Sequence, residues 1–290
     1  MREYAIAWVD AFTSTPLHGN ACAVVLDARG LDDATMQAIA RETNLSETAF
    51  VFPGDAEADF SVRYWTPAGE IPLAGHPTIA TAHALRETGR LAGLDVLRLR
   101  MPAGVIPVAV GDGRYGMSQP PPEFGAKFPR AAAAAALRLE ESDLLAGATP
   151  QTVSTGTPQL MIPLASVGAL DRCEPDRRAL FGRPEREWFS VHVFARGDGD
   201  AALVARHFAD FGDVIEDPFT GSATGGMAGY CARYGIVTER NYAVAQGAHV
   251  HRPGRAQVEI GGTPPAQIGR ITVTGEAVTV LRGTLTLPES

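Results

Sequence analysis

Two stretches of the chain follow one pattern. "EIPLAGHPTIATA" covers residues 70–82, and "EDPFTGSATGGMA" covers residues 216–228. Identical residues recur 146 positions apart, about half of the 290-residue chain: Glu70 and Glu216, Pro72 and Pro218, Gly75 and Gly221, Thr78 and Thr224, Ala82 and Ala228, Gly89 and Gly235. Similarity at this offset indicates a protein built from two similar halves.

Each copy of the pattern predicts a buried helix. Pro77 suits a first helical turn, small residues follow it, and Gly89 suits a C-terminal cap. Before Arg86 nearly every face of this segment is small or apolar, so we expect it to lie inside a domain. The second copy predicts an equivalent helix over residues 222–234.

Strands dominate the rest of the chain. Runs rich in β-branched and aromatic residues lie at 4–12, 21–27, 48–53 and 59–67, with one amphipathic helix expected within residues 31–47. The three prolines of "QPPPEFGAKFP" (119–129) predict a linker. After it, the second half has the same order of strands and a small-residue helix as the first half. Strands follow strands too often for regular βαβ alternation, so a single doubly wound sheet is the less favoured alternative.

The sequence therefore predicts an α+β fold of two pseudo-symmetric domains. Each is expected to be a curled, mostly antiparallel, barrel-like sheet around a central buried helix, with the active site in the cleft between the domains. We expect the domains at residues 1–118 and 129–278, and the last strand, at about 279–288, can also join the first domain.

The composition of the chain argues against nucleic-acid and membrane partners. The chain has 25 basic and 33 acidic residues, the wrong balance for nucleic-acid binding. Asp10 interrupts any export signal, and the most uniform apolar run, residues 131–137, is far shorter than the roughly 20 residues that cross a bilayer. We expect a cytoplasmic protein with no membrane partner. Its three cysteines, Cys22, Cys173 and Cys231, lack zinc or disulfide spacing and are expected to be buried thiols.

The starts of the two predicted helices are candidate anion sites. A helix N-terminus presents unpaired N–H groups and a partial positive charge, and a glycine allows a ligand to approach closely. The predicted substrate-binding residues are Gly75, Gly221, Ser222 and Ala223, and the predicted ligand is a small carboxylate. The alternative is that these glycines only allow helix and sheet to pack tightly.

Three titratable residues are candidate catalytic groups. His76 follows Gly75, and Asp217 precedes Pro218. Glu47 stands between Leu45 and an apolar strand, where desolvation would favour the protonated carboxyl and suit a proton carrier. The alternative for Glu47 is a solvated turn. We expect no metal, because His249 and His251 lack a third ligand.

Five segments together resemble the phenazine biosynthesis PhzF-like family, which shares the diaminopimelate epimerase fold. They are "DAFTSTPLHGNACAVVL", "NLSETAFVF", "RYWTPAGEIPLAGHPTIATAHAL", "EDPFTGSATGGMAGY" and "QGAHVHRPGRAQVEI", in family order between residues 10 and 260. The resemblance implies an active site without a cofactor, with Glu47 as acid and base. It also implies that His76, Asp217 and Ser222 bind substrate or handle protons.

The resemblance leads to one favoured function and two alternatives. We expect a cofactor-independent isomerase that shifts a proton and a double bond in a small cyclic unsaturated carboxylate, either dihydro-hydroxyanthranilate-like or proline-derived, in phenazine or other antibiotic biosynthesis. The alternatives are an amino-acid or hydroxyproline epimerase and a non-catalytic carboxylate-binding protein. Thiol epimerases of this fold carry a Cys just before each helix-start Gly, where this chain has Ala74 and Thr220. A homodimer is expected by the same resemblance.

Overall fold

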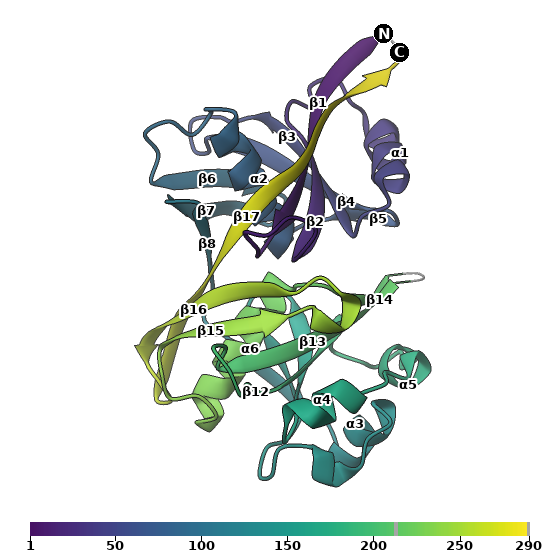
Figure 1. Ribbon diagram of the computed structural model, residues 1–290, viewed down its shortest axis with the longest axis vertical. Helices are drawn as coiled ribbons and strands as arrows, with labels where there is room; N and C mark the ends of the chain where they lie inside the picture. The colour runs from purple at the N-terminus through teal and green to yellow at the C-terminus, as the bar shows by residue number, and fades with distance from the viewer. Residues whose placement is uncertain (212–213, 289–290) are drawn as a thin grey trace. The chain divides into compact units, whose positions relative to one another are not determined.

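The computed structural model describes residues 1–211 and 214–288 (Figure 1). The chain divides into two compact units. The first unit is residues 1–118 with the chain from Thr274 onward, and the second unit is residues 119–273. In the described residues, none of the helices has the length and apolar character needed to cross a bilayer.

The strands of the first unit form a closed ring. Strand β17 pairs with both β1 and β8, and the remaining neighbours are β1–β2, β2–β3, β3–β4, β4–β6, β6–β7 and β7–β8. In Figure 1, β17 lies along β1, so the two ends of the chain are neighbours. The strands are β1 (Arg2–Ala11), β2 (Asn20–Val25), β3 (Glu47–Pro53), β4 (Phe60–Thr66), β5 (Gly69–Ile71), β6 (Val96–Met101), β7 (Gly104–Gly111), β8 (Arg114–Gln119) and β17 (Gln267–Leu287).

Two helices pack on this ring in different ways. Helix α2 (Gly75–Glu87) is buried at every residue from His76 to Leu85 and contacts β1, β2, β3 and β7, as a central helix must. Helix α1 (Asp33–Thr43) is amphipathic and places its apolar face against β3 and β4. The Asp32 side chain accepts a hydrogen bond from the Thr35 N–H and caps the start of α1.

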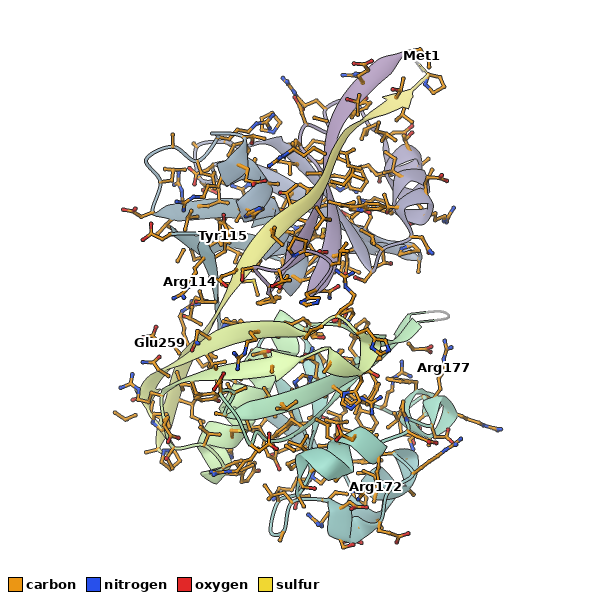
Figure 2. All side chains as sticks on the ribbon, viewed as in Figure 1. Met1, Arg114, Tyr115, Arg172, Arg177 and Glu259 are labelled. Carbon is orange, nitrogen blue, oxygen red and sulfur yellow. The ribbon has the colours of Figure 1, made fainter. Side chains whose placement is uncertain are left out.

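The second unit has the same plan. Helix α6 (Gly221–Tyr234) is buried along most of its length and contacts β10, β11, β12 and β16. Three short helices, α3 (Arg130–Ala136), α4 (Val167–Arg172) and α5 (Arg177–Phe181), enclose a further apolar cluster, and Figure 2 labels the exposed Arg172 and Arg177 on two of them. The strands are β9 (Glu123–Lys127), β10 (Gln151–Ser154), β11 (Pro158–Pro163), β12 (Ser190–Arg196), β13 (Leu203–Phe211), β14 (Val214–Asp217), β15 (Asn241–Gln246), β16 (Gly254–Thr263) and the first part of β17.

Strand pairing repeats between the units. The pairs β1–β2 and β10–β11 are antiparallel, β2–β3 and β11–β12 are parallel, and β3–β4 and β12–β13 are antiparallel. The pairs β4–β6 and β13–β15 are parallel, and in each unit a short antiparallel strand, β5 or β14, leads into the buried helix. The predicted α+β class of two pseudo-symmetric, barrel-like, mostly antiparallel units is therefore confirmed.

The segment expected to be a linker is partly a strand. Residues 123–127 form β9, which pairs antiparallel with β10. Gln119 is buried, and its Nε2 donates a hydrogen bond to the Gly221 carbonyl, 2.8 Å away. The prolines at 120–122 cannot donate backbone hydrogen bonds, but the residues after them can, so the strand begins where the prolines end.

Candidate active site

A left-handed turn delivers Glu47 to the first unit's candidate site. Helix α1 ends at Thr43, and Asn44 adopts a φ of 50°, a conformation that asparagine tolerates better than most residues. The hydroxyls of Thr43 and Thr48, 2.8 Å apart, bridge this turn. Glu47 is the first residue of β3 and is only 8% exposed. Its carboxyl is therefore buried and does not lie in a solvated turn.

His76 meets this carboxyl from the start of α2. Gly75 is the first residue of the helix, and the His76 side chain that follows it is buried. The His76 Nε2 atom lies 3.2 Å from Oε2 of Glu47 and 3.5 Å from the Ser46 hydroxyl. The fold thus joins two predicted catalytic residues that are far apart in the sequence.

Asn20 completes this group and was not predicted. It is the first residue of β2, is 2% exposed, and places its Nδ2 atom 3.0 Å from Nδ1 of His76. Gly19 before it has a φ of 57°, and a Cβ there would stand 2.2 Å from the Ala11 carbonyl oxygen, so the turn requires glycine. The available signal was the Gly-Asn pair just before a strand, inside a segment that carries the family resemblance.

Cys22 lies beside Glu47 in the parallel register of β2 and β3. Its thiol is fully buried and donates to the carbonyl of Ala23. Burial, and then the charge of Glu47, raise the pKa of the Cys22 thiol well above its usual value. Cys22 is therefore not poised to act as a thiolate base.

The N-cap side chain of α2 makes no capping hydrogen bond to the first turn of the helix. Ala74 is the N-cap residue, and the Thr78 hydroxyl instead donates back to the Ala74 carbonyl, 2.6 Å away. The Tyr64 hydroxyl lies 2.8 Å from the same Thr78 oxygen. These first-turn groups carry the partial positive charge of the helix dipole beside Glu47 and His76.

In the second unit, Asp217 ends β14 and is 7% exposed. The Thr220 hydroxyl donates to its Oδ2 at 2.5 Å. The buried Gln246 donates from Nε2 to the Asp217 carbonyl at 2.9 Å and accepts from the Thr220 N–H at 3.3 Å. Gln246 was not predicted, and it fixes the turn that connects Asp217 to helix α6.

The start of α6 is held by two glutamines. Gln119 donates to the Gly221 carbonyl, and Gln159 donates to the Ser222 hydroxyl at 3.1 Å. Ser222 is half-buried, whereas Gly221 and Ala223 are buried, and Ala223 has no exposed surface.

The predicted residues thus fall into two groups, Glu47, Gly75 and His76 in the first unit and Asp217, Gly221, Ser222 and Ala223 in the second. Their substrate and catalytic roles, and the cleft expected to unite them, stay predictions. His249 bonds Asp171 at 3.0 Å, and no group of three candidate metal ligands occurs among the described residues.

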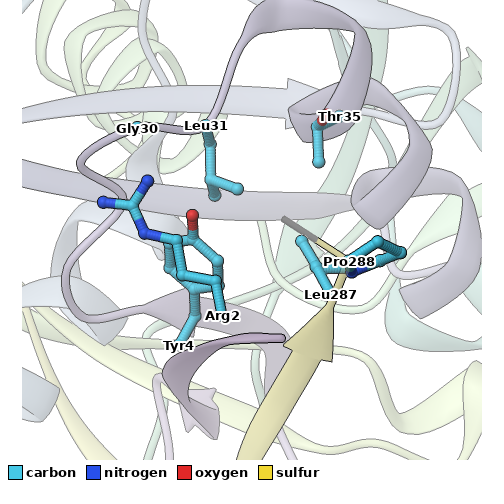
Figure 3. A pocket seen from close by; sticks show the side chains of 7 residues that line it. All are labelled: Arg2, Tyr4, Gly30, Leu31, Thr35, Leu287 and Pro288. Atoms are coloured by element: carbon cyan, nitrogen blue, oxygen red, sulfur yellow. The ribbon is translucent and has the colours of Figure 1, made fainter. Parts of the chain in front are cut away.

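A separate pocket lies at the N-terminal end of β1 and is shown in Figure 3. None of the predicted site residues lines it. Its lining comes from β1, from the loop before α1 and the first turn of that helix, and from the end of β17 with the residue after it: Arg2, Tyr4, Gly30, Leu31, Thr35, Leu287 and Pro288.

Comparison with known proteins identifies the family. A family model described as "Phenazine biosynthesis-like protein" matches residues 9–283. An uncharacterized isomerase of Clostridium acetobutylicum is 32% identical, with 99% of each chain covered. The trans-2,3-dihydro-3-hydroxyanthranilate isomerase of Pseudomonas aeruginosa is 34% identical over 98% of this chain and 99% of its own.

Solved structures of related proteins have the same fold as this chain. A PhzF family protein of Bacillus anthracis superposes with a TM-score of 0.89 at 30% identity, covering 99% of this chain and 100% of its own. A hydroxyproline epimerase of Agrobacterium vitis shares the fold with a TM-score of 0.65 at 14% identity, and the match covers 98% of this chain and 91% of the epimerase. The chain therefore belongs to the phenazine biosynthesis-like, or PhzF, family and is an isomerase.

Proposed function

We propose that this isomerase moves a proton and a double bond within a small cyclic unsaturated carboxylate, without a cofactor, and that Glu47 carries the proton. The observation that supports this role is the burial of Glu47 with its Oε2 atom 3.2 Å from Nε2 of His76. A buried carboxyl beside an imidazole is a suitable acid and base, because its environment is dry and its orientation is fixed.

The reaction balances with one carboxylate. Glu47 takes a proton from an sp3 carbon next to the conjugated system, and the C–H electron pair spreads over that system. The same carboxyl, after its acidic proton has exchanged with solvent, protonates the far end of the conjugated system, which shifts the double bond. Glu47 ends in its starting state, so no oxidant, reductant or second base is needed.

The intermediate anion requires stabilisation beyond proton transfer. General acid–base action contributes about 10²- to 10⁴-fold, so positioning and electrostatic stabilisation must supply the rest. The first-turn N–H groups of α2 and their partial positive charge, next to Glu47, suit this purpose. We propose that His76 and Asp217 orient the substrate or hold a second proton, and that Gly75, Gly221, Ser222 and Ala223 bind it.

The first substrate to test comes from the relatives. The proteins of Pseudomonas aeruginosa and Pseudomonas fluorescens that are named trans-2,3-dihydro-3-hydroxyanthranilate isomerase are each 34% identical to this chain. A proline-derived unsaturated carboxylate is the second. Epimerisation by two thiols is disfavoured, since Ala74 and Thr220 occupy the positions before the helix-start glycines.

The decisive experiment follows deuterium. Wild-type protein in D₂O with trans-2,3-dihydro-3-hydroxyanthranilate should incorporate solvent deuterium into the compound. Glu47→Gln should abolish incorporation while ligand affinity stays nearly unchanged. Glu42→Gln, on an exposed residue of α1, is the matched control and should exchange like the wild type. Undiminished exchange by Glu47→Gln would remove Glu47 from the mechanism.

A further inference from the structure

The hydrogen bond between Asn20 and His76 fixes where the imidazole carries its proton. An amide nitrogen donates and cannot accept, so Nδ1 of His76, 3.0 Å from Nδ2 of Asn20, must be the accepting, unprotonated nitrogen. The other nitrogen, Nε2, faces Oε2 of Glu47 at 3.2 Å, where a carboxylate favours an N–H group. Both ends of the ring thus indicate the same tautomer.

The orientation of the Asn20 amide agrees with this assignment. The Ser46 hydroxyl, 3.5 Å away, donates to Oδ1 of Asn20, which leaves Nδ2 to face the imidazole. Were His76 doubly protonated, its Nδ1–H would point at the N–H groups of this amide, and two donors would face each other. Asn20 therefore disfavours the imidazolium form.

We propose that Asn20 is a positioning residue that keeps His76 neutral, with its proton on Nε2, the ring nitrogen that lies 3.2 Å from Oε2 of Glu47. Asn20 suits this task because it is 2% exposed and paired with Ala11 in the β1–β2 register, after the obligatory Gly19 turn. Its amide can turn only by losing its bond to the ring.

The proposal has one consequence, which rests on the proposed function. A neutral imidazole with its proton on Nε2, 3.2 Å from Oε2 of Glu47, cannot act as a base toward that carboxyl, so the substrate proton stays with Glu47.

The tautomer can be observed directly. Long-range ¹H–¹⁵N correlations from the carbon-bound ring protons of ¹⁵N-labelled protein distinguish protonated from unprotonated ring nitrogens, and loss of signals in His76→Gln assigns those of His76. We expect wild-type His76 to show a protonated Nε2 and an unprotonated Nδ1 at neutral pH. A protonated Nδ1 in the wild type overturns the proposal, whatever the variants do.

Asn20→Asp replaces the amide donor to Nδ1 of His76 with an acceptor of nearly the same shape. Its carboxylate accepts, so Nδ1 of His76 should become protonated. Asn241→Asp, at the exposed start of β15, adds the same charge elsewhere and should leave the His76 pattern unchanged. An unchanged pattern in Asn20→Asp, or a changed one in the control, contradicts the proposal.

The deuterium-exchange assay separates this proposal from the proposed function. Loss of an outer hydrogen-bond partner of a functional histidine costs about 10- to 100-fold at metal sites, and we expect a similar loss of exchange in Asn20→Asp. If Glu47→Gln still exchanges, the proposed function fails while the tautomer result stands. If wild-type His76 carries its proton on Nδ1, the role of Asn20 fails while Glu47 keeps its own.

Discussion

Arg206 and Glu216 form a bidentate ion pair in which each side chain is only 10% exposed, with Nε–Oε1 and Nη2–Oε2 distances of 3.0 and 2.7 Å. The internal repeat supplies a second copy. Arg63 and Glu70 make the same two contacts at 2.6 Å each, but with 30% and 28% of their side chains exposed. The same ion-pair geometry thus occurs in a buried and in a more exposed environment. Each pair lies on the two strands that lead into a buried helix.

Breaking the two pairs should have unequal costs. Glu216→Gln leaves the Arg206 guanidinium buried against the carbonyls of Leu170 and Cys173 without its carboxylate, and such a loss costs about 3–5 kcal/mol. Glu70→Gln is the matched control in the more exposed pair, where the expected cost is about 0–1 kcal/mol because water screens the charges. Urea denaturation of both variants measures the difference. Equal costs would show that burial does not decide the value of this pair.

A buried histidine pair should make the protein sensitive to mild acid. His192 and His207 face each other on β12 and β13, with their Nδ1 atoms 3.2 Å apart and almost no exposure. Burial lowers the pKa of His207 to about 3, and burial together with His207 lowers the pKa of His192 well below its usual value. In the unfolded chain both titrate near about 6.5. Below that pH the unfolded state binds more protons than the folded state, so stability should fall as pH drops.

Free energies of unfolding measured at pH 7 and pH 5 test whether stability falls as the pH drops. Most paired carboxylates stay ionised in this interval, so histidines dominate the slope. The double variant H192L/H207L replaces both partners of the bond with apolar groups and should show a weaker dependence than the wild type. His251→Asn removes an exposed histidine from a residue at φ 57°, a conformation that asparagine accepts, and should leave the slope unchanged. An unaltered slope in the double variant would exclude the pair as its source.

Thiol reagents should not inactivate the folded protein. All three cysteines are buried, with exposures of 0% for Cys22, 2% for Cys173 and 0% for Cys231. Burial raises the pKa of Cys173 to about 12 and that of Cys231 higher still, so each thiol stays protonated and unreactive at neutral pH. Iodoacetamide at pH 7.5 should leave deuterium exchange intact, while urea-unfolded protein should take up three adducts by mass spectrometry. Rapid inactivation traced to one cysteine would revive a thiol mechanism.

The helices were easier to predict from sequence than the closure of the barrel. Small residues, Pro77 and the terminal glycines signalled α2 and α6, because burial and helix termination are local requirements. The pairing of Arg2 with Leu287 joins opposite ends of the chain, and no local pattern specifies it. Strand β9 was concealed by the prolines that precede it.

The candidate site likewise contains residues that could be predicted from the sequence and residues that could not. Glu47 and His76 were identifiable by residue type, since carboxyl and imidazole groups transfer protons. Asn20 and Gln246 were not, because an amide acquires a role only when strand register places it against a particular partner. Their positions depend on the β1–β2 and β15–β16 registers, which the sequence alone does not state.

The small-residue face of α6 should tolerate no added methyl group at Gly229. A Cβ there would lie 2.7 and 2.8 Å from ring carbons of Pro122 and 3.4 Å from Cδ1 of Ile271. Alanine normally stabilises a helix by roughly 0.5–1 kcal/mol relative to glycine. The rigid proline ring cannot swing aside, however, so overpacking should cost about 1–3 kcal/mol and make Gly229→Ala destabilising. The control is Gly168→Ala in α4, where the nearest atoms stand 3.8 Å away and the helical gain should be realised. Thermal denaturation of the two variants should therefore give shifts of opposite sign, whereas a stabilised Gly229→Ala would mean that the Pro122 segment moves away from α6 at little cost.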